Sequence, residues 1–488
     1  MEKIQEFLLP YVQKANEWLS DYILIILLVG VGLFFTVTTR FVQIRCFGEG
    51  MKRVFGGIKL FGGKQSGGGL SSFQALATAI AAQVGTGNIV GASGAILIGG
   101  PGAIFWMWII AFLGMSTIYA EAVLAQKTRV IDKDGEVHGG PVYYIKKAFK
   151  GGFGKFLAGF FAVAITLALG FMGSMVQSNS ISESICNAVD VDYTKWGWIV
   201  GIVLVLVTAV IFLGGIKRIA SVAEKIVPIM AVVFLLGGLL VLGVRYKYIP
   251  ETLGMIFKYA FSPNALIGGT IGYAIKTAIS QGAKRGLFSN EAGMGSTPHA
   301  HAQANVEKPH DQGVVAMIGV FIDTFIVLTI TALVVISCLY AGDGKLAGLS
   351  GDSYALATNP DLGIVIKTNA MQMAVGSAFG EIFGDIGTQI GGIFVAVCLL
   401  FFAFTTIISW NFFGKINVQY LFKNNKTAVT VYSVLSIAFI FVGTLLKNDI
   451  VWEFTDFFNY LMVIPNALAL FALWKIVSKS AKESKLKK

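Results

Sequence analysis

Long runs of apolar residues recur along the whole chain and determine its predicted architecture. A helix needs about twenty mainly apolar residues to cross the hydrocarbon core of a bilayer. Runs of that length lie at residues 21–39, 70–98, 101–126, 155–182, 196–213, 219–243, 262–283, 313–341, 387–413, 427–446 and 450–476. The sequence therefore predicts an all-α polytopic membrane protein with 11 transmembrane helices, and its 55% hydrophobic and 13% charged residues fit that class.

The first run follows an amphipathic stretch at residues 1–20 and ends at Thr38-Thr39-Arg40. No small-residue cleavage pattern accompanies it, so it is predicted to be a membrane helix rather than a signal peptide. Cysteines at positions 46, 186, 338 and 398 show no C-x-x-C spacing. We expect structural thiols there rather than a disulfide framework or a metal site.

Lysine and arginine are concentrated in alternate segments between the runs. Residues 40–64, 127–155, 217–225, 284–308, 415–426 and 475–488 hold 28 Lys and Arg, whereas the alternate segments hold nine. Because positive loops stay in the cytoplasm, this pattern predicts an outside amino terminus and a cytoplasmic carboxyl terminus in the cell membrane. The net charge of +11 is then a topology signal that also contacts anionic lipid, and a nucleic-acid partner is not expected.

The apolar run at residues 70–98 is interrupted near its middle by Gly85-Thr86-Gly87-Asn88. Gly-x-Gly lets a helix unwind, which leaves peptide groups free to line a substrate or ion site. The glycines do not follow the G-x-G-x-x-G register of a dinucleotide loop. Close helix packing would also explain Gly85 and Gly87, but packing alone does not require Thr86 and Asn88 beside them.

Without the first run, ten runs remain and divide into five plus five. The predicted units are residues 1–69, a first repeat at 70–243, a second repeat at 244–476 with an outer loop at 341–386, and a basic tail at 477–488. The second repeat contains another glycine-rich stretch, GGTIGY at residues 268–273, which includes Thr270 and Gly272. An odd number of helices in each half predicts an inverted repeat, with the site where two broken helices meet.

Residues 99–114, with the sequence GGPGAIFWMWIIAFLG, resemble the signature of the alanine or glycine:cation symporter family. Residues 83–88, 175–180, 285–293 and 404–406, together with Ser409 and Trp410, also resemble that family. The resemblance implies a LeuT-type fold preceded by one extra helix. It also implies uptake of alanine, glycine or a similar small neutral amino acid, with sodium or protons as the coupling ion and no other cofactor.

An amino-acid substrate needs hydrogen-bond donors for its carboxylate and acceptors for its ammonium group. The N–H groups of Thr86 and Gly87 begin a half-helix whose positive dipole end suits an anion. Gln177 is preferred over Asn179 as a further contact, although helix–helix bonding explains either residue equally well. The predicted substrate contacts are Gly85, Thr86, Gly87, Asn88, Gln177, Asn179, Thr270 and Gly272.

Three hydroxyl residues, Thr405, Thr406 and Ser409, lie on one helical face. Hydroxyl and carbonyl oxygens are the hard ligands that sodium prefers. The LeuT-type resemblance implies a sodium site made by the carbonyl groups of Ala81, Val84 and Phe402 and the hydroxyl groups of Thr405 and Thr406. Alternatively, these hydroxyls simply bond the carbonyl four residues back in their own helix.

Ionisable residues within apolar runs are rare and are usually paired or functional. Lys276 and Asp323 are such residues, and we expect them to form a gate or a charge pair between neighbouring helices. Glu121 and Glu291 lie nearer the inner surface and are expected to snorkel or to anchor loops. The histidines at 138, 299, 301 and 310 fall in cytoplasmic segments, where His299-Ala300-His301 is predicted to be solvated loop rather than a metal site.

Secondary active symport is the function that these patterns favour. The alternatives are a proton-coupled transporter of another small zwitterion and, less favoured, an ion channel. No ring of charged residues or repeated filter motif supports a channel. The predicted spans hold no histidine, and H-E-x-x-H and the ATP-binding pattern G-x-x-x-x-G-K-[ST] are absent, so we predict neither an enzyme nor an ATP-driven pump.

Overall fold

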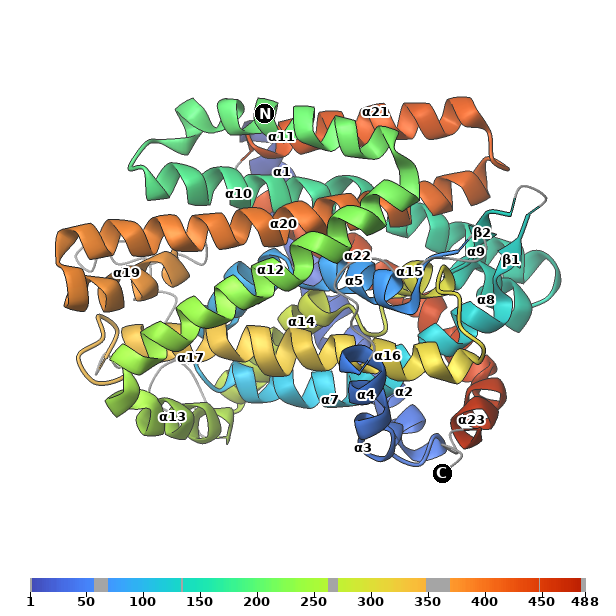
Figure 1. Cartoon of the computed structure of the whole chain (residues 1–488), viewed down its shortest axis with the longest axis horizontal. Coiled ribbons are helices and arrows are strands. Elements are labelled where there is room, and N and C mark those ends of the chain that lie inside the picture. Colours follow the sequence, from blue (N-terminus) through green and yellow to red (C-terminus); the bar gives the residue numbers. More distant parts are fainter. Residues whose placement is uncertain are drawn as a thin grey trace.

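The computed structural model describes residues 2–56, 69–132, 135–261, 271–347, 369–446 and 448–483, almost all of them helical. Within these residues nine helices are long and apolar enough to cross a membrane, and one bent pair makes a tenth. The long helices lie side by side along the long axis of the molecule (Figure 1). The predicted run at 262–283 begins outside the described residues and continues as the helix Ile271–Asn290.

Up to residue 261 the helices are α1 (Glu2–Trp18), α2 (Ile25–Thr38), α3 (Val42–Arg45), α4 (Phe47–Phe55), α5 (Ser72–Gln83), α6 (Ala92–Gly99), α7 (Ala103–Thr128), α8 (Pro141–Ala148), α9 (Gly151–Ile165), α10 (Ser174–Ala188), α11 (Tyr193–Leu213), α12 (Gly215–Val244) and α13 (Ile249–Phe261). From residue 271 they are α14 (Ile271–Asn290), α15 (Pro298–Ala302), α16 (Pro309–Val320), α17 (Thr329–Leu339), α19 (Ala370–Phe383), α20 (Asp385–Leu421), α21 (Lys426–Gly443), α22 (Asn448–Ala472) and α23 (Trp474–Lys482).

Wider helical turns of the π type join several of these helices without ending them. They are η1 (Leu19–Leu24), η2 (Gly87–Gly91), η3 (Thr166–Gly173) and η5 (Phe321–Leu328), and a short 3₁₀ turn, η4 (Tyr246–Tyr248), precedes α13. Two short strands, β1 (Val130–Ile131) and β2 (Val137–His138), form an antiparallel hairpin. The hairpin lies at the same end of the molecule as α8 (Figure 1).

The amino-terminal helix is longer than the sequence predicted. α1, η1 and α2 run on without a break, because Trp18 and Leu24 both keep right-handed helical torsions. The continuous helix that contains the first predicted membrane span includes residues from Phe7 to Thr38. The polar Asn16 is accommodated because its amide donates to a carboxyl oxygen of Glu453 on α22, 2.6 Å away. The expected separate amphipathic segment is therefore the first part of one long helix.

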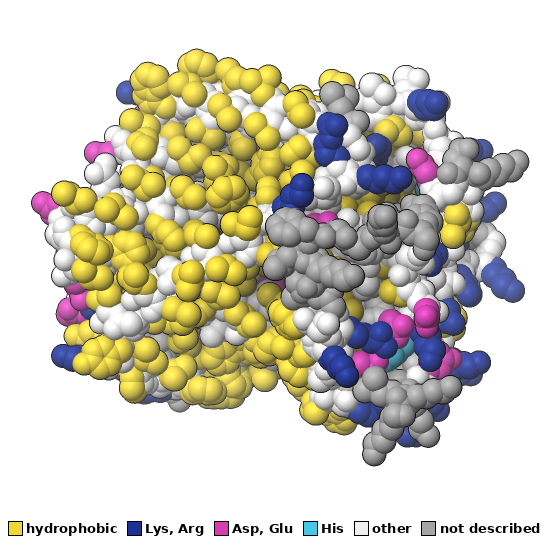
Figure 2. Space-filling view, in the orientation of Figure 1, with side chains coloured by type: hydrophobic (Ala, Val, Ile, Leu, Met, Phe, Trp, Pro, Cys, Tyr) yellow, Lys and Arg dark blue, Asp and Glu magenta, His cyan; other side chains and the backbone are white. Residues whose placement is uncertain are grey.

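The outer surface of the helical bundle is apolar over most of its length. Exposed aliphatic residues follow α12 and α20, for example Ile229, Leu236 and Ile393. Figure 2 shows these apolar side chains covering one side of the molecule, whereas Lys and Arg gather at the end that carries α8, the hairpin and α23. This division is the one that a bilayer imposes on a polytopic protein.

The first predicted break is present between α5 and η2, where the two helical halves meet at an angle of 47°. Val84 leaves the helix with ψ at 87°, so its carbonyl turns away from the helix axis. The N–H of Gly85 is then capped by the side-chain oxygen of Asn88 at 3.0 Å. A Cβ atom at Gly85 would lie 3.2 Å from the Gln177 side-chain oxygen and closer still to the Thr406 hydroxyl, so glycine is required by packing as well.

A break in the second half of the chain lies at the far end of α14 from the predicted GGTIGY stretch, whose residues 268–270 fall outside the described residues. The chain is helical from Ile271, so the GGTIGY stretch is not unwound over its described residues. α14 instead ends at Asn290, and Glu291, Gly293 and Gly295 take positive φ angles of 57°, 94° and 80° before α15 begins. Thr270 lies outside the described residues. Gly272 stands at the start of α14, about 27 Å along the helix from the break.

The two breaks lie against each other. The Gln83 amide at the end of α5 donates to the carbonyl of Asn290 at the end of α14, at 2.7 Å. A Cβ atom at Gly87 would lie 3.0 Å from the Cα atom of Ser289. Near the end rich in Lys and Arg, Leu70 exchanges peptide hydrogen bonds of 2.9 and 2.8 Å with Gln303 and Asn305. Two interrupted helices therefore run past each other with their breaks in contact.

Candidate functional site

The side chain of Gln177, on α10, reaches the first break. Its oxygen accepts the N–H of Thr86 at 3.1 Å. The Gln177 amide nitrogen and the Thr86 hydroxyl are both buried and have no hydrogen-bond partner among the described residues. Buried polar groups are normally satisfied, so two such groups at one break mark a place where a polar ligand can bind.

The side chain of Asn88, a predicted substrate contact, makes hydrogen bonds within the protein at both its oxygen and its nitrogen. Its oxygen caps Gly85, and its amide nitrogen donates to a carboxyl oxygen of Asp323 on η5 at 2.7 Å. Both ends of the side chain are thus occupied by the protein. These bonds tie the first break to η5.

Asn179, the other candidate on α10, points away from the break. Its amide donates to the carbonyls of Gly443, the last residue of α21, and of Leu446, at 3.0 and 2.7 Å. It joins two helices, which is the alternative that the sequence left open. The structure thus places Gln177 at the first break and Asn179 outside it.

Lys276 and Asp323 do not form the expected pair. Lys276 is half exposed and bonds Asp21 of the amino-terminal helix, with 2.9 Å between nitrogen and oxygen. Asp323 is fully buried and accepts hydrogen bonds from Asn88, from Ser289 at 2.9 Å and from Thr324 at 2.8 Å. Asp323 therefore belongs to the region where the breaks meet, whereas Lys276 lies outside it.

Oxygen atoms from α5 and α20 converge beside the first break. The Thr406 hydroxyl lies 2.9 Å from the Ala81 carbonyl and 3.0 Å from the Phe402 carbonyl. A hydroxyl has one proton and cannot satisfy both carbonyls at once, so the cluster has spare acceptor capacity. The Thr405 hydroxyl lies 2.9 Å from the same Phe402 carbonyl. The carbonyl of Val84 is freed from helical bonding by the torsion of that residue.

The cluster fits a sodium ion by the chemistry of its atoms. Hydroxyl and carbonyl oxygens are hard, neutral ligands, and no carboxylate is needed to bind a monovalent cation with them. Thr405 and Thr406 do bond back to their own helix, as the alternative reading predicted. The contact from Thr406 to Ala81 crosses to another helix, which back-bonding alone does not explain.

A layer of large side chains covers one side of the paired breaks. Phe288, next to Gly87, packs with ring centroids 4.8 Å from Trp452 and 5.8 Å from Trp410. Arg285 lies over Trp452 and forms an ion pair of 3.0 Å with Asp456 on α22. These ring contacts and the ion pair join α14 to α22, so separating the two helices would break the layer.

Glu121 and Glu291 are buried, whereas the sequence offered snorkelling as one reading. Glu121, on α7, accepts the N–H groups of Gly293 and Gly295 at 3.1 and 2.9 Å, and Asn466 donates to it at 2.6 Å. Glu291 accepts from Ser296 and, at 2.6 Å, from the Trp410 ring nitrogen. Both carboxyl groups therefore anchor the unwound segment after α14, which is the other reading that the sequence offered.

The segment with His299 and His301 is not solvated loop, because both side chains are buried. His299 contacts Asn417 at 2.9 Å and the Ser296 carbonyl at 2.7 Å, and His301 contacts Gln312 at 2.9 Å. These contacts fasten α15 to its neighbours. Neither histidine belongs to a group of metal-binding side chains in the described part of the chain.

Two residues of the site were not recognised from the sequence. Ser289 and Asn290 stand at the end of α14, where the second break meets the first. The usable signal was the run SNEAGMGS at residues 289–296, which combines polar residues with two closely spaced glycines. Such a run inside an apolar helix indicates unwinding as strongly as the GTGN run does.

Loss of the Glu121 carboxyl group should destabilise the second break. Glu121→Ala leaves two buried peptide N–H groups without an acceptor, and each orphaned group costs roughly 1–3 kcal/mol. We expect a clearly lower melting temperature for the purified protein in detergent. Glu121→Gln keeps one acceptor oxygen and should lose less. An unchanged melting temperature for Glu121→Ala would contradict the anchoring role.

Residues 5–488 match the model of the sodium:alanine symporter family. The sodium/alanine symporter AgcS of Methanococcus maripaludis is 38% identical over 96% of this chain and 96% of its own length. The probable sodium/glutamine symporter GlnT of Bacillus subtilis is 36% identical over 98% of this chain and 91% of its own length.

The fold is similar to that in the crystal structure of MhsT in complex with L-phenylalanine. The TM-score is 0.58 at 15% identity, over 86% of this chain and 99% of that chain. This likeness supports the LeuT-type fold, and the family consists of transporters rather than enzymes. The chain belongs to the sodium:alanine symporter family.

Proposed function

We propose that this chain is a secondary active symporter that couples sodium entry to uptake of a small neutral amino acid such as alanine or glycine. The observation that carries the proposal is the meeting of two helix breaks beside a cluster of hard oxygens. There the Thr86 hydroxyl and the Gln177 amide nitrogen are buried without partners, and the Thr406 hydroxyl lies between the carbonyls of Ala81 and Phe402. The name of the related sodium/alanine symporter supports the same assignment.

The substrate carboxylate binds at the start of the half-helix Gly87–Gly99, whose positive dipole end favours an anion. The Thr86 N–H, predicted as a donor, already bonds Gln177. The donors to the substrate carboxylate are therefore the Thr86 hydroxyl, the Gln177 amide nitrogen and the N–H of Gly87. Phe288 and Ser289 pack close to Gly87, which favours a substrate with a small side chain. The sodium/glutamine name of one relative makes glutamine the first competing substrate to test.

Alternating access requires two repeats that run in opposite senses through the membrane, and we assign them to residues 70–243 and 244–476. We place the break of the second repeat at residues 291–297, instead of at Thr270 and Gly272. The layer formed by Phe288, Trp452 and the Arg285–Asp456 ion pair acts as the outer gate. It replaces the gate that was expected from Lys276 and Asp323.

We expect an outside amino terminus and a cytoplasmic carboxyl terminus, because the basic segments share one end of the molecule (Figure 2). A cysteine placed at the exposed Lys14 should react with a membrane-impermeant maleimide in intact cells, and one at the exposed Lys479 only after lysis. The four native cysteines are buried and give little background. The reverse labelling pattern would overturn the orientation.

Liposomes containing the purified protein test the function directly. An inward sodium gradient should drive accumulation of radiolabelled alanine, with glutamine and glycine as competitors. Asp323 is a buried carboxyl group at the breaks and is the group through which protons would couple instead. Accumulation driven by a proton gradient without sodium would favour that alternative, and equilibration without accumulation would favour a channel.

The same liposomes test the oxygen cluster. Thr406→Ala should raise the sodium concentration for half-maximal uptake roughly 10-fold, since a lost hydrogen bond to a charge costs about 1.5 kcal/mol. Thr208→Ala is the matched control, because Thr208 is buried on α11 and bonds only its own helix. An unchanged sodium requirement in well-folded Thr406→Ala protein would exclude this hydroxyl as a ligand.

A further inference from the structure

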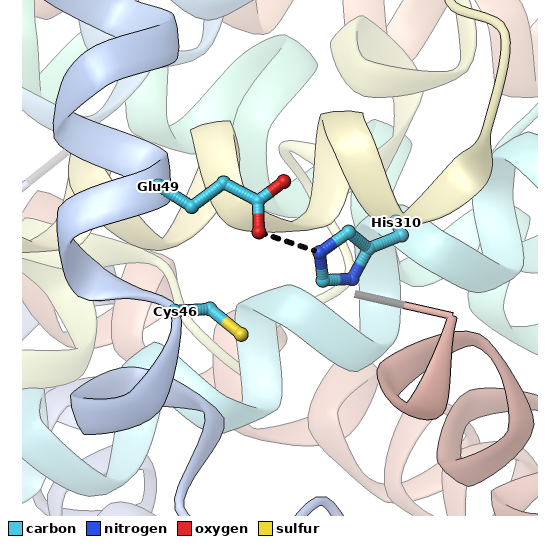
Figure 3. A group of neighbouring side chains, drawn as sticks. All are labelled: Cys46, Glu49 and His310. Carbon is cyan, nitrogen blue, oxygen red and sulfur yellow. Dashed lines mark hydrogen bonds and ion pairs between the residues drawn. The ribbon is translucent and has the colours of Figure 1, made fainter. Parts of the chain in front are cut away.

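A second group of ligand-type side chains lies far along the chain from the breaks, at the end rich in Lys and Arg. Cys46, Glu49 and His310 each direct one ligand atom into a common space, and these atoms lie within 4.8 Å of one another (Figure 3). Cys46 immediately precedes α4, Glu49 is in the first turn of α4, and His310 is in the first turn of α16. The sequence had suggested only a structural thiol at Cys46 and placed His310 in a cytoplasmic segment.

Close packing of α4 on α16 holds the group together. At Gly50 a Cβ atom would lie 2.7 Å from the Ile318 side chain and 2.8 Å from the Val314 carbonyl, so the two helices touch there. Phe47 packs its ring edge against Phe321, with centroids 4.9 Å apart. The ligand residues of the two helices are therefore held at a fixed separation rather than brought together by chance.

The distances suit a tetrahedral ion. With zinc bonds of about 2.0–2.3 Å, the ligand atoms around one ion stand roughly 3.3–3.8 Å apart. The His310 Nε2 and Glu49 Oε2 atoms are 3.4 Å apart, already within that range. The Cys46 sulfur needs to move by at most about 1 Å to join them.

Neighbouring side chains orient two of the ligands. The Tyr119 hydroxyl bonds His310 Nδ1 at 2.8 Å, which leaves Nε2 facing Glu49. Arg53 binds the other carboxyl oxygen of Glu49 at 2.9 Å and also pairs with Asp311. Outer contacts of this kind fix ligand geometry in metal sites.

We propose that Cys46, Glu49 and His310 bind one zinc ion, or a similar thiophilic divalent metal, and fasten α4 to α16. A thiolate and an imidazole select such a metal over sodium, magnesium or calcium, which prefer oxygen ligands. The thiolate and the carboxylate together neutralise the charge of the ion. The site is separate from the transport site and would tie the segment after the first membrane helix to the helix that continues to Asp323.

Metal titration of the full-length protein in detergent tests the proposal. After treatment with a chelator, the protein should bind zinc with one high-affinity equivalent, measured by competition with a chromophoric indicator. Cys46→Ser and Glu49→Gln should each weaken zinc binding at least tenfold. Cys338→Ser, at another buried cysteine on α17, is the matched control and should bind zinc like the parent.

Cobalt identifies the ligands independently of variant stability. The parent protein should show thiolate-to-cobalt charge-transfer absorption, which Cys46→Ser abolishes and Cys338→Ser retains. The trio Asp132, Glu136 and His138 beside the hairpin has no thiol and contributes nothing to this band. Absence of the band in the parent, or equal zinc affinity in Cys46→Ser, would overturn the proposal and leave Glu49 and His310 as a plain hydrogen-bonded pair.

Discussion

Peptide groups inside a membrane must find hydrogen-bond partners within the protein, and this constraint governs both helix breaks. At the first break, Asn88 caps the N–H of Gly85. At the second, Glu121 accepts the N–H groups of Gly293 and Gly295 from a different helix. The unwound backbone is stable because side chains replace the missing helical bonds. At the first break, Asp323 accepts the amide of Asn88 and Gln177 accepts the N–H of Thr86, which ties this break to η5 and α10.

This arrangement leaves a small number of polar atoms for ligands. The Thr406 hydroxyl is shared between α20 and the end of α5, so an ion bound there would hold the broken helix against the unbroken one. The proposed substrate contacts Thr86 and Gly87 lie only a few residues after the end of α5. Ion binding and substrate binding would therefore depend on the same local backbone, which is the physical basis that symport requires.

The apolar periodicity predicted most of the spans and the first break, because those features depend on local composition. The break after Asn290 was not predicted, because that segment unwinds where Glu121 supplies acceptors from a helix distant in sequence. The bond from Asn16 to Glu453 likewise depends on α22, which is distant in sequence.

The directions in which individual side chains point could not be predicted from the sequence either. The sequence placed Gln177 and Asn179 on one helix, but only packing decides that the former meets Thr86 and the latter meets Gly443. The partner of Lys276 could not be anticipated either, since Asp21 comes from the helix outside the predicted repeats. Family resemblance named residues of the oxygen cluster, and the structure brings Ala81, Phe402 and Thr406 together there.

The central claim is that the amino-acid carboxylate binds at the half-helix that starts at Gly87. Calorimetry on the purified protein with saturating sodium, comparing alanine with alaninamide below pH 7, tests it most directly, because both ligands then carry a protonated amino group. The account predicts at least tenfold weaker binding of alaninamide, equivalent to about 1.4 kcal/mol. Equal affinities would contradict the carboxylate assignment and the placement of the substrate at the paired breaks.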